Sequence, residues 1–190
     1  MDGSGILRNI AKHVSLDQAE VDHFISLLTR REICRKEILQ LEGKPCDMVH
    51  YVQAGTLRAF YRDRDGNEKT IMFAIQDWWI TDMYAFIQQK PAVLNIDALE
   101  DSTVLQLQKA DLDKLYLRVP KFERFFRIIL QNAYIREQQR VVECLSMTAE
   151  ERHRNFLKRY PQFAQRVPLK QIASYLGITP EFLSVLRKKK

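Results

Sequence analysis

The sequence predicts an α+β protein in which an antiparallel β domain precedes one long helix and a small helical domain. Three observations support this prediction. Short runs rich in β-branched and aromatic residues, separated by Gly and Pro, occupy residues 33–107. After Lys109 the apolar residues recur at helical spacing instead. Residues 152–190 then combine a concentrated positive charge with a second, shorter helical pattern.

The composition is that of an ordinary globular protein. Of the 190 residues, 46% are hydrophobic and 28% charged, and only six are Gly and six Pro, which excludes a disordered or fibrous chain. No apolar run approaches the ~18 residues of a membrane span. The first residues also lack the basic-then-apolar order of a signal peptide. We therefore expect a cytoplasmic protein that makes no membrane contact.

Cysteines and histidines give no sign of a metal site. Cys34, Cys46 and Cys144 lie far apart without a CxxC pair, and the four His show no pair at ligand spacing. We expect reduced thiols and no bound metal, iron–sulfur cluster or haem.

The first domain is predicted at residues 1–118. A helix near its start has Ser15 as the expected N-cap and apolar residues at helical spacing. Strand-like runs follow at 33–41, 48–54, 56–61, 70–73, 93–99 and 103–107. Asp65-Gly66 predicts a hairpin between two of the runs, because this pair tolerates positive φ angles. The spacing of the runs indicates a sandwich or barrel of about 100 residues.

A long helix is predicted at residues 119–146. Pro120 interrupts the helical pattern before it, and a wide apolar face follows. A helix of this length cannot bury such a face against itself, so the face packs on the β domain or on a second copy of the chain. For the second case the expected contact residues are Phe122, Phe125, Phe126, Ile129 and Ala133.

The C-terminal domain, residues 147–190, is predicted to contain a helix-turn-helix. Thr148 and Glu151 form a capping box that starts its first helix. Gly177 suits the tight turn of the motif, which requires a left-handed backbone. Thr179 is a good N-cap for the second helix and Pro180 a good first residue. The apolar positions fit this register: Ile172, Ala173, Leu176, Ile178, Leu183 and Leu186.

Charge connects this motif with DNA. Residues 152–190 hold ten Lys and Arg against one acid, a net charge of +9, whereas residues 1–151 have a net charge of −3. A basic segment attracts polyanions, and the second helix fits a major groove with its N-terminal end first. A solvated basic tail or a plain helical hairpin is the alternative. The residues expected to contact DNA are Lys170, Thr179, Pro180, Glu181, Ser184, Val185, Arg187 and Lys188.

Two groups of residues, in this order along the chain, resemble the CRP/FNR family of bacterial transcription regulators. They are YVQAGTLR at 51–58 with DG at 65–66, and QIASYLGIT at 171–179 with LS at 183–184. The resemblance implies an N-terminal cyclic-nucleotide-binding-type β-roll (double-stranded β-helix or jelly-roll type), a long dimerisation helix and a C-terminal helix-turn-helix. It also implies a homodimer on a two-fold-symmetric site of double-stranded DNA, with RNA polymerase as a further partner.

The resemblance assigns roles within the second helix. Glu181 matches an acid of the family that reads a base, and it can accept a hydrogen bond from cytosine N4. The arginines that flank this acid in the family fall on Pro180 and Val185. Neither residue can donate to guanine, so we expect an operator different from the family's best-known one. Lys170 and Arg187 are expected on phosphates.

The phosphate-binding stretch of the family is altered here. Thr81 and Asp82 replace the family's Gly-Glu, and Ala92-Val93 replaces its Arg-Ser. A buried phosphate would lack its arginine, so we expect no binding of cyclic AMP. The effector pocket is expected at Trp79, Thr81, Asp82, Met83, Ala92 and Val93. The aromatic residues of this region either fill the pocket as core or bind a different, more apolar effector, whose identity the sequence leaves open.

The sequence also bears on two other function classes. The sequence has no catalytic triad, P-loop or dinucleotide-binding glycine motif, so we expect no enzyme. The alternative to a DNA-binding regulator is a β-roll ligand-binding module whose basic helical tail docks a protein partner.

Overall fold

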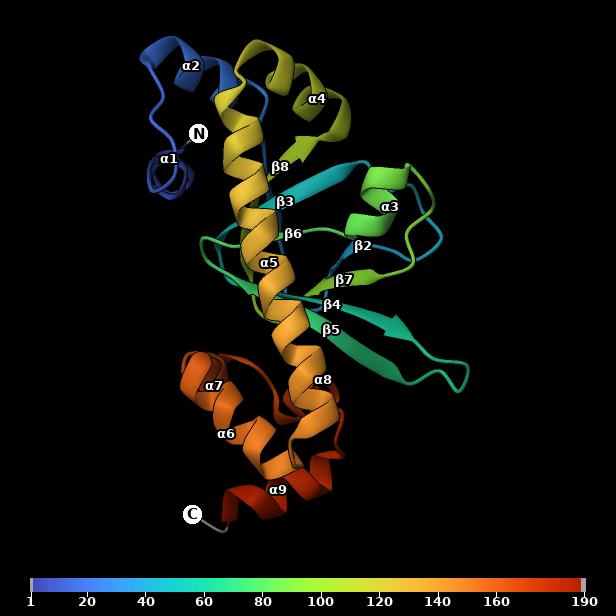
Figure 1. The fold of residues 1–190 in the computed structure, drawn as a ribbon. Helices are drawn as coiled ribbons and strands as arrows, with labels where there is room; N and C mark the ends of the chain where they lie inside the picture. Colours follow the sequence, from blue (N-terminus) through green and yellow to red (C-terminus); the bar gives the residue numbers. More distant parts are fainter. Residues whose placement is uncertain (1, 189–190) are drawn as a thin grey trace. The chain divides into compact units, whose positions relative to one another are not determined.

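The computed structural model describes residues 2–188, without the side chain of Lys188, and shows helices around a β domain and at the C-terminal end (Figure 1). The helices are α1 (Ser4–Ala11), α2 (Gln18–Ser26), α3 (Met83–Gln88), α4 (Lys109–Arg118), α5 (Lys121–Ser146), α6 (Ala149–Arg159), α7 (Phe163–Arg166), α8 (Leu169–Leu176) and α9 (Pro180–Lys188). Within the described residues, none of these helices is long and apolar enough to cross a membrane.

The strands form two antiparallel sheets. They are β1 (Thr29–Ile33), β2 (Ile38–Gln40), β3 (Met48–Ala54), β4 (Thr56–Arg62), β5 (Glu68–Ile75), β6 (Trp79–Ile80), β7 (Asn95–Ala98) and β8 (Ser102–Gln108). One sheet has the order β1-β8-β3-β6 and the other β2-β7-β4-β5. Neighbours distant in sequence, such as β1 and β8, pair in each sheet, as in the β-roll that the sequence predicts.

The chain divides into two compact units. Unit 1 contains the residues up to Ala59 and Phe73–Gln131. Unit 2 contains Phe60–Met72 and the residues from Asn132 onward. Each unit therefore takes part of α5 and part of the β4–β5 hairpin. The expected boundaries at 118/119 and 146/147 stay a prediction.

The core of unit 1 lies between the β3–β8 sheet and the helices. Tyr51 and Leu107 contribute from the strands, and Phe24 contributes from α2. Alternate residues of β3 point in opposite directions, and all of Val49–Val52 is buried, so both faces of this strand are covered. The Trp79 ring packs at 5.1 Å from that of Phe126 between centroids.

The apolar face at the start of α5 belongs to this core. Phe122, Phe125 and Phe126 are buried within the single chain, and Ile129 packs beside them half-buried. These side chains are therefore not available to a second copy, and the prediction that they form the dimer contact is wrong for the three phenylalanines. The sequence pattern left both packings open, since a helical period is the same whichever surface covers it. Ala133 lies half-buried one turn further along.

One local prediction needs correction, and another is confirmed. The cap of α2 is Asp17 rather than Ser15: its carboxylate accepts from the N–H of Glu20, whose own carboxylate accepts from the N–H of Asp17. The predicted hairpin forms between β4 and β5, with Asp65-Gly66 inside a turn at residues 63–67. Gly66 there has φ +80°, and the Asp63 carboxylate accepts from the N–H of Asn67.

Candidate DNA-binding surface and sensor pocket

The helix-turn-helix forms as the sequence predicts. Gly177 follows α8 with φ +68°, a left-handed conformation that favours glycine, and its N–H lies 3.2 Å from the carbonyl oxygen of Ser174. Thr179 caps α9, because its hydroxyl accepts from the N–H of Phe182 at 3.2 Å. Ile172, Ala173, Leu176, Leu183 and Leu186 are all buried, so the two helices share an apolar contact.

The side of α9 opposite Leu183 and Leu186 faces solvent. Glu181, Ser184 and Val185 are exposed on it, at spacings of three and four residues. We call these three residues the recognition face. The hydroxyl of Ser184 donates to the carbonyl oxygen of Pro180 at 2.9 Å.

The remaining predicted DNA contacts lie around this face. Lys170 at the start of α8 and Arg187 near the end of α9 are both exposed, as is Thr179, whereas Pro180 is half-buried. The side chain of Lys188 lies outside the described residues. The structure thus brings together on α9 most of the predicted set, with Lys170 on the neighbouring helix.

Unit 2 also contains a support for α8 that the sequence did not predict. The hydroxyl of Ser174 donates to the carbonyl oxygen of Glu68 and accepts from the N–H of Thr70 at 2.9 Å. This one side chain therefore bonds to two backbone groups of β5. Arg140 of α5 donates to the carbonyl oxygens of Ile71 and Tyr175. The position of α8 is therefore fixed from the hairpin and from α5 together.

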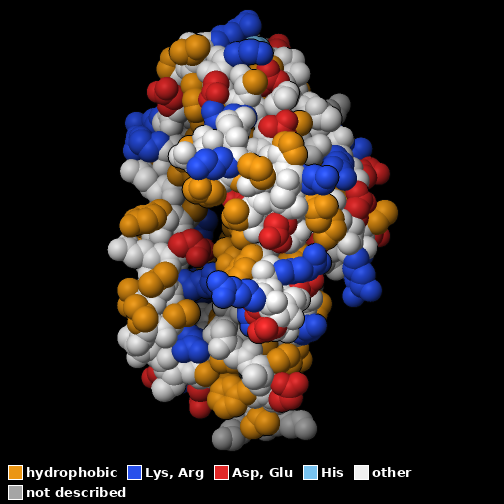
Figure 2. All heavy atoms as spheres, turned by 90° about the vertical axis from the view of Figure 1, so that its right-hand side faces the viewer, with side chains coloured by type: hydrophobic (Ala, Val, Ile, Leu, Met, Phe, Trp, Pro, Cys, Tyr) orange, Lys and Arg blue, Asp and Glu red, His pale blue; other side chains and the backbone are white. Residues whose placement is uncertain are grey.

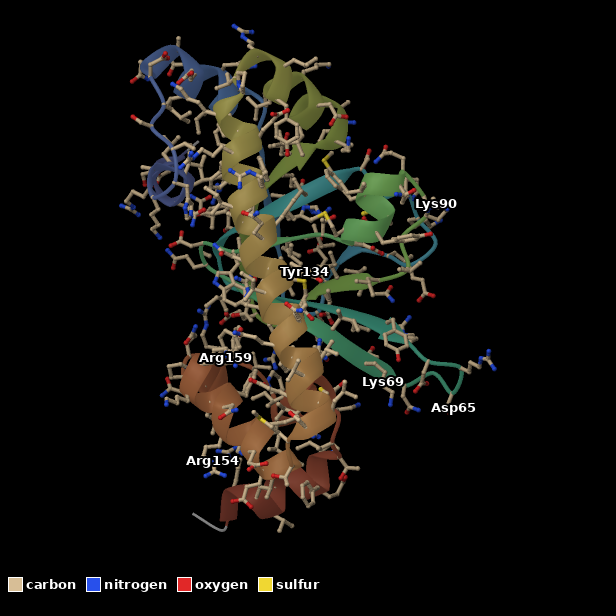
Figure 3. All side chains as sticks on the ribbon, in the orientation of Figure 1. Asp65, Lys69, Lys90, Tyr134, Arg154 and Arg159 are labelled. Carbon is tan, nitrogen blue, oxygen red and sulfur yellow. The ribbon has the colours of Figure 1, made fainter. Side chains whose placement is uncertain are left out.

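Aromatic rings fill the interior of unit 2. The rings of Phe156 and Phe163 stack at 5.9 Å, and Tyr175 approaches Phe156 at 5.5 Å. The Arg140 guanidinium lies 4.1 Å from the centroid of the Tyr175 ring, a cation–π contact. Burial raises the pKa of Tyr175 to about 12, so its hydroxyl stays neutral. Arg154 of α6 is exposed, and Arg159 at the end of α6 forms an ion pair with Glu143 of α5 (Figure 3).

The predicted sensor pocket is occupied by its own chain. The carboxylate of Asp82 is buried and caps α3, where it accepts from the N–H of Ala85 at 3.2 Å. Its second oxygen accepts from the N–H of Val93 at 2.7 Å and of Leu94 at 2.9 Å. This carboxylate thus takes backbone donors on both sides of the stretch where the family binds phosphate.

The other predicted pocket residues do not converge on one cavity. Thr81 is buried and donates to the carbonyl oxygen of Met48, and Ala92 is buried as well. Trp79 packs into the core, whereas Met83 and Val93 are exposed. Figure 2 faces the side on which Figure 1 places α3, and hydrophobic side chains lie there among charged ones.

A buried arginine in the sensor is also engaged. Arg58 on β4 donates through Nε and Nη2 to the two carboxylate oxygens of Asp97 on β7, at 3.0 and 2.6 Å. Such a bidentate pair leaves the guanidinium committed to its partner. The described residues of the stretch around Asp82 therefore do not fit a cyclic nucleotide: Ala92 and Val93 offer no cation, and a phosphate would have to displace Asp82 from the N–H groups of Val93 and Leu94. In the sequence, the position of Arg58 between the apolar residues Leu57 and Ala59 is the feature that could have indicated its burial.

Among residues 2–188 no group of three or more His, Cys, Asp or Glu side chains is placed to hold a metal ion.

Comparisons with known proteins agree with this architecture. Residues 30–118 match the model of the cyclic nucleotide-binding domain. The chain is 24% identical to the anaerobic regulatory protein of Pasteurella multocida, over 90% of this chain and 67% of that protein. It is 26% identical to the transcriptional regulatory protein btr of Bordetella pertussis, over 96% of this chain and 80% of that protein. The fold is that of FixK2 from Bradyrhizobium japonicum, with a TM-score of 0.75 at 19% identity, covering 85% of this chain and 83% of that one.

These relatives are regulators rather than enzymes, and the similarity extends from the β domain to the helix-turn-helix. Residues 30–118 thus match the cyclic nucleotide-binding domain family, and most of the chain is similar to transcriptional regulators of the CRP/FNR type.

Proposed function

We propose that this protein is a sequence-specific DNA-binding transcription regulator that acts as a homodimer and works without cyclic AMP. The observation that carries the proposal is the recognition face: exposed side chains of Glu181, Ser184 and Val185 on a helix that Gly177 and Thr179 set at the turn of a helix-turn-helix. Such a helix enters the major groove, while flanking cations contact phosphates. The names of the relatives, as regulators, support the same role.

A homodimer is supported by a second face of α5. Leu130, Tyr134, Val141, Val142 and Leu145 are exposed large hydrophobic residues of α5 that follow the buried Phe122 and Phe126 along the helix. Leu145 is 83% exposed and Tyr134, labelled in Figure 3, is 68% exposed. An apolar stripe at spacings of three and four residues suits pairing with the same helix of a second copy. We call these five residues the α5 stripe.

Independence from cyclic AMP is supported by the pocket. Asp82 occupies the backbone donors, Arg58 is paired with Asp97, and Ala92-Val93 offers no cation. We propose no other effector. RNA polymerase and a cytoplasmic location stay predictions.

The DNA-binding role is tested by selecting binding sites from random duplex DNA with the full chain and sequencing them. We expect a palindrome whose half-sites lie about one helical turn apart, 10–10.5 base pairs. Bulk binding that is sensitive to salt but enriches no sequence would contradict the proposal and favour the alternative, a basic tail that docks a protein partner.

The dimer is tested by sedimentation of Leu145→Glu beside Leu117→Glu, a matched exposed leucine on α4. We expect the first variant to be a monomer and the second a dimer like the original chain. A Leu145→Glu variant that remains a dimer would place the interface elsewhere.

A further inference from the structure

We infer that Val185 of the recognition face reads the methyl group of thymine, beside acceptors that select the amino groups of adenine or cytosine. This inference rests on the proposed function and adds the chemistry of the half-site to it. It comes from what Glu181, Ser184 and Val185 can offer to a base edge.

The polar groups of the face are acceptors. A carboxylate such as that of Glu181 only accepts hydrogen bonds. The hydroxyl of Ser184 has a single hydrogen, which it donates to the carbonyl oxygen of Pro180 at 2.9 Å. Towards solvent it therefore presents lone pairs, and donating to a base would require this bond to break.

Acceptors on the protein select donors on the DNA. In the major groove the donors are the N6 amino group of adenine and the N4 amino group of cytosine. Guanine presents two acceptors, N7 and O6, and would place oxygen or nitrogen lone pairs against those of Glu181 or Ser184. Reading guanine directly normally uses Arg or Lys, and neither lies among the three residues of the face.

Val185 supplies the remaining contact. It follows Glu181 by four residues, so both project from the same side of α9, and Val185 is 51% exposed. Its side chain has no hydrogen-bonding group, so its two methyl groups can contact a base favourably only at an apolar group. The apolar group on a base edge in the major groove is the C5 methyl of thymine.

Two exposed cations of the described part of α8 and α9, Lys170 and Arg187, lie away from the recognition face. Arg187 follows the buried Leu183 by four residues, so it leaves α9 nearer the buried side than the recognition face. Lys170 belongs to α8. Both suit phosphates, which carry no sequence information directly.

The test uses the full chain and a duplex recovered by binding-site selection. Each thymine of one half-site is exchanged for uracil, which removes only the C5 methyl group, and the Kd is measured at fixed salt for the original chain and for Val185→Ala. We expect one position at which the exchange weakens binding of the original chain by about fourfold, the value of one buried methylene. Val185→Ala, which lacks the two γ-methyl groups, should lose most of this difference between the duplexes.

Two further variants sharpen the result. Lys170→Ala should weaken binding to every duplex and keep the sensitivity to uracil. Val185→Arg should move the preferred base pair at the sensitive position to one that contains guanine.

The outcomes separate the two proposals. An enriched palindrome that shows no sensitivity to uracil, or the same sensitivity in Val185→Ala, overturns the inference and leaves the proposed function standing. If no sequence is enriched, both are wrong.

Discussion

The stretch around Asp82, which the sequence predicts as an effector pocket, differs from the recognition face of α9 in one respect. Its polar group is bonded within the chain, whereas the side chains of the recognition face are exposed. In the sensor, the Asp82 carboxylate accepts from the N–H groups of Ala85, Val93 and Leu94. On α9, Glu181 and Val185 point to solvent from a helix that its own capping and apolar contacts already hold. Polar groups that the chain satisfies itself stabilise the fold, whereas groups left exposed on a fixed helix can bind a ligand. The stretch around Asp82 is therefore closed, in that the chain bonds its polar group, and the recognition face is open, in that its side chains are exposed.

The largest expected effect concerns the buried ion pair of Arg58 and Asp97. Arg58→Ala leaves the buried Asp97 carboxylate without its partner, and we expect a loss of about 3–5 kcal/mol in the free energy of unfolding, measured by urea denaturation. Arg30→Ala is the matched control, since Arg30 pairs with Glu32 on the exposed surface and should cost about 0–1 kcal/mol. Similar losses for the two variants would show that the buried pair stabilises the fold no more than a surface pair does.

Replacing Asp82 tests whether its carboxylate stabilises the stretch that the sequence predicts as an effector pocket. Asp82→Ala removes the acceptor of three backbone N–H groups, and we expect a loss of about 2–3 kcal/mol in unfolding free energy. Asp82→Asn keeps one acceptor oxygen and should lose less. A variant as stable as the original chain would mean that the carboxylate does not hold this stretch together.

The pH dependence of stability tests another buried group of the β domain, His50, through the slope of the unfolding free energy against pH. Burial lowers the pKa of His50 to about 3, whereas in the unfolded chain it is near 6.5. Between these values the unfolded chain binds the extra proton, so stability falls with decreasing pH, by about 1.4 kcal/mol per pH unit from this group. Above pH 6.5 the group has no effect. His50→Gln should flatten the slope between pH 6 and 4, and an unchanged slope would assign it to other groups.

The smallest effect on stability is expected on the open side of the comparison. Glu181 is exposed, so Glu181→Ala should change the unfolding free energy by no more than about 0.5 kcal/mol. The same variant should raise the Kd for the selected duplex by about tenfold or more, because one base contact is lost. Loss of stability together with loss of DNA binding would make Glu181 a structural residue instead.

The features that the sequence predicted well are local ones. Gly177, Thr179 and Pro180 carry conformational and capping preferences that act within a few residues, and each takes its predicted place. The same holds for Thr148 and Glu151, whose reciprocal capping bonds both form. The strand pattern also indicated the β domain, because alternation and turn residues depend on neighbours in sequence.

The features that the sequence could not predict depend on distant partners. The bond between Ser174 and Thr70 joins residues 104 positions apart, and nothing in either residue type indicates the other. The pair of Arg58 with Asp97 required knowledge of which strands are neighbours. For Phe122 and Phe126, periodicity identified the buried face of α5, but only the fold shows that the sheet domain covers it rather than a second copy.

One measurement tests the contrast between closed sensor and open recognition face most directly. The Kd of the full chain for its selected duplex is measured at fixed salt with and without saturating cyclic AMP. We predict the same Kd in both cases, because Asp82 and Asp97 hold the groups that a nucleotide would need. Specific DNA binding that appears only when cyclic AMP is present would contradict this account.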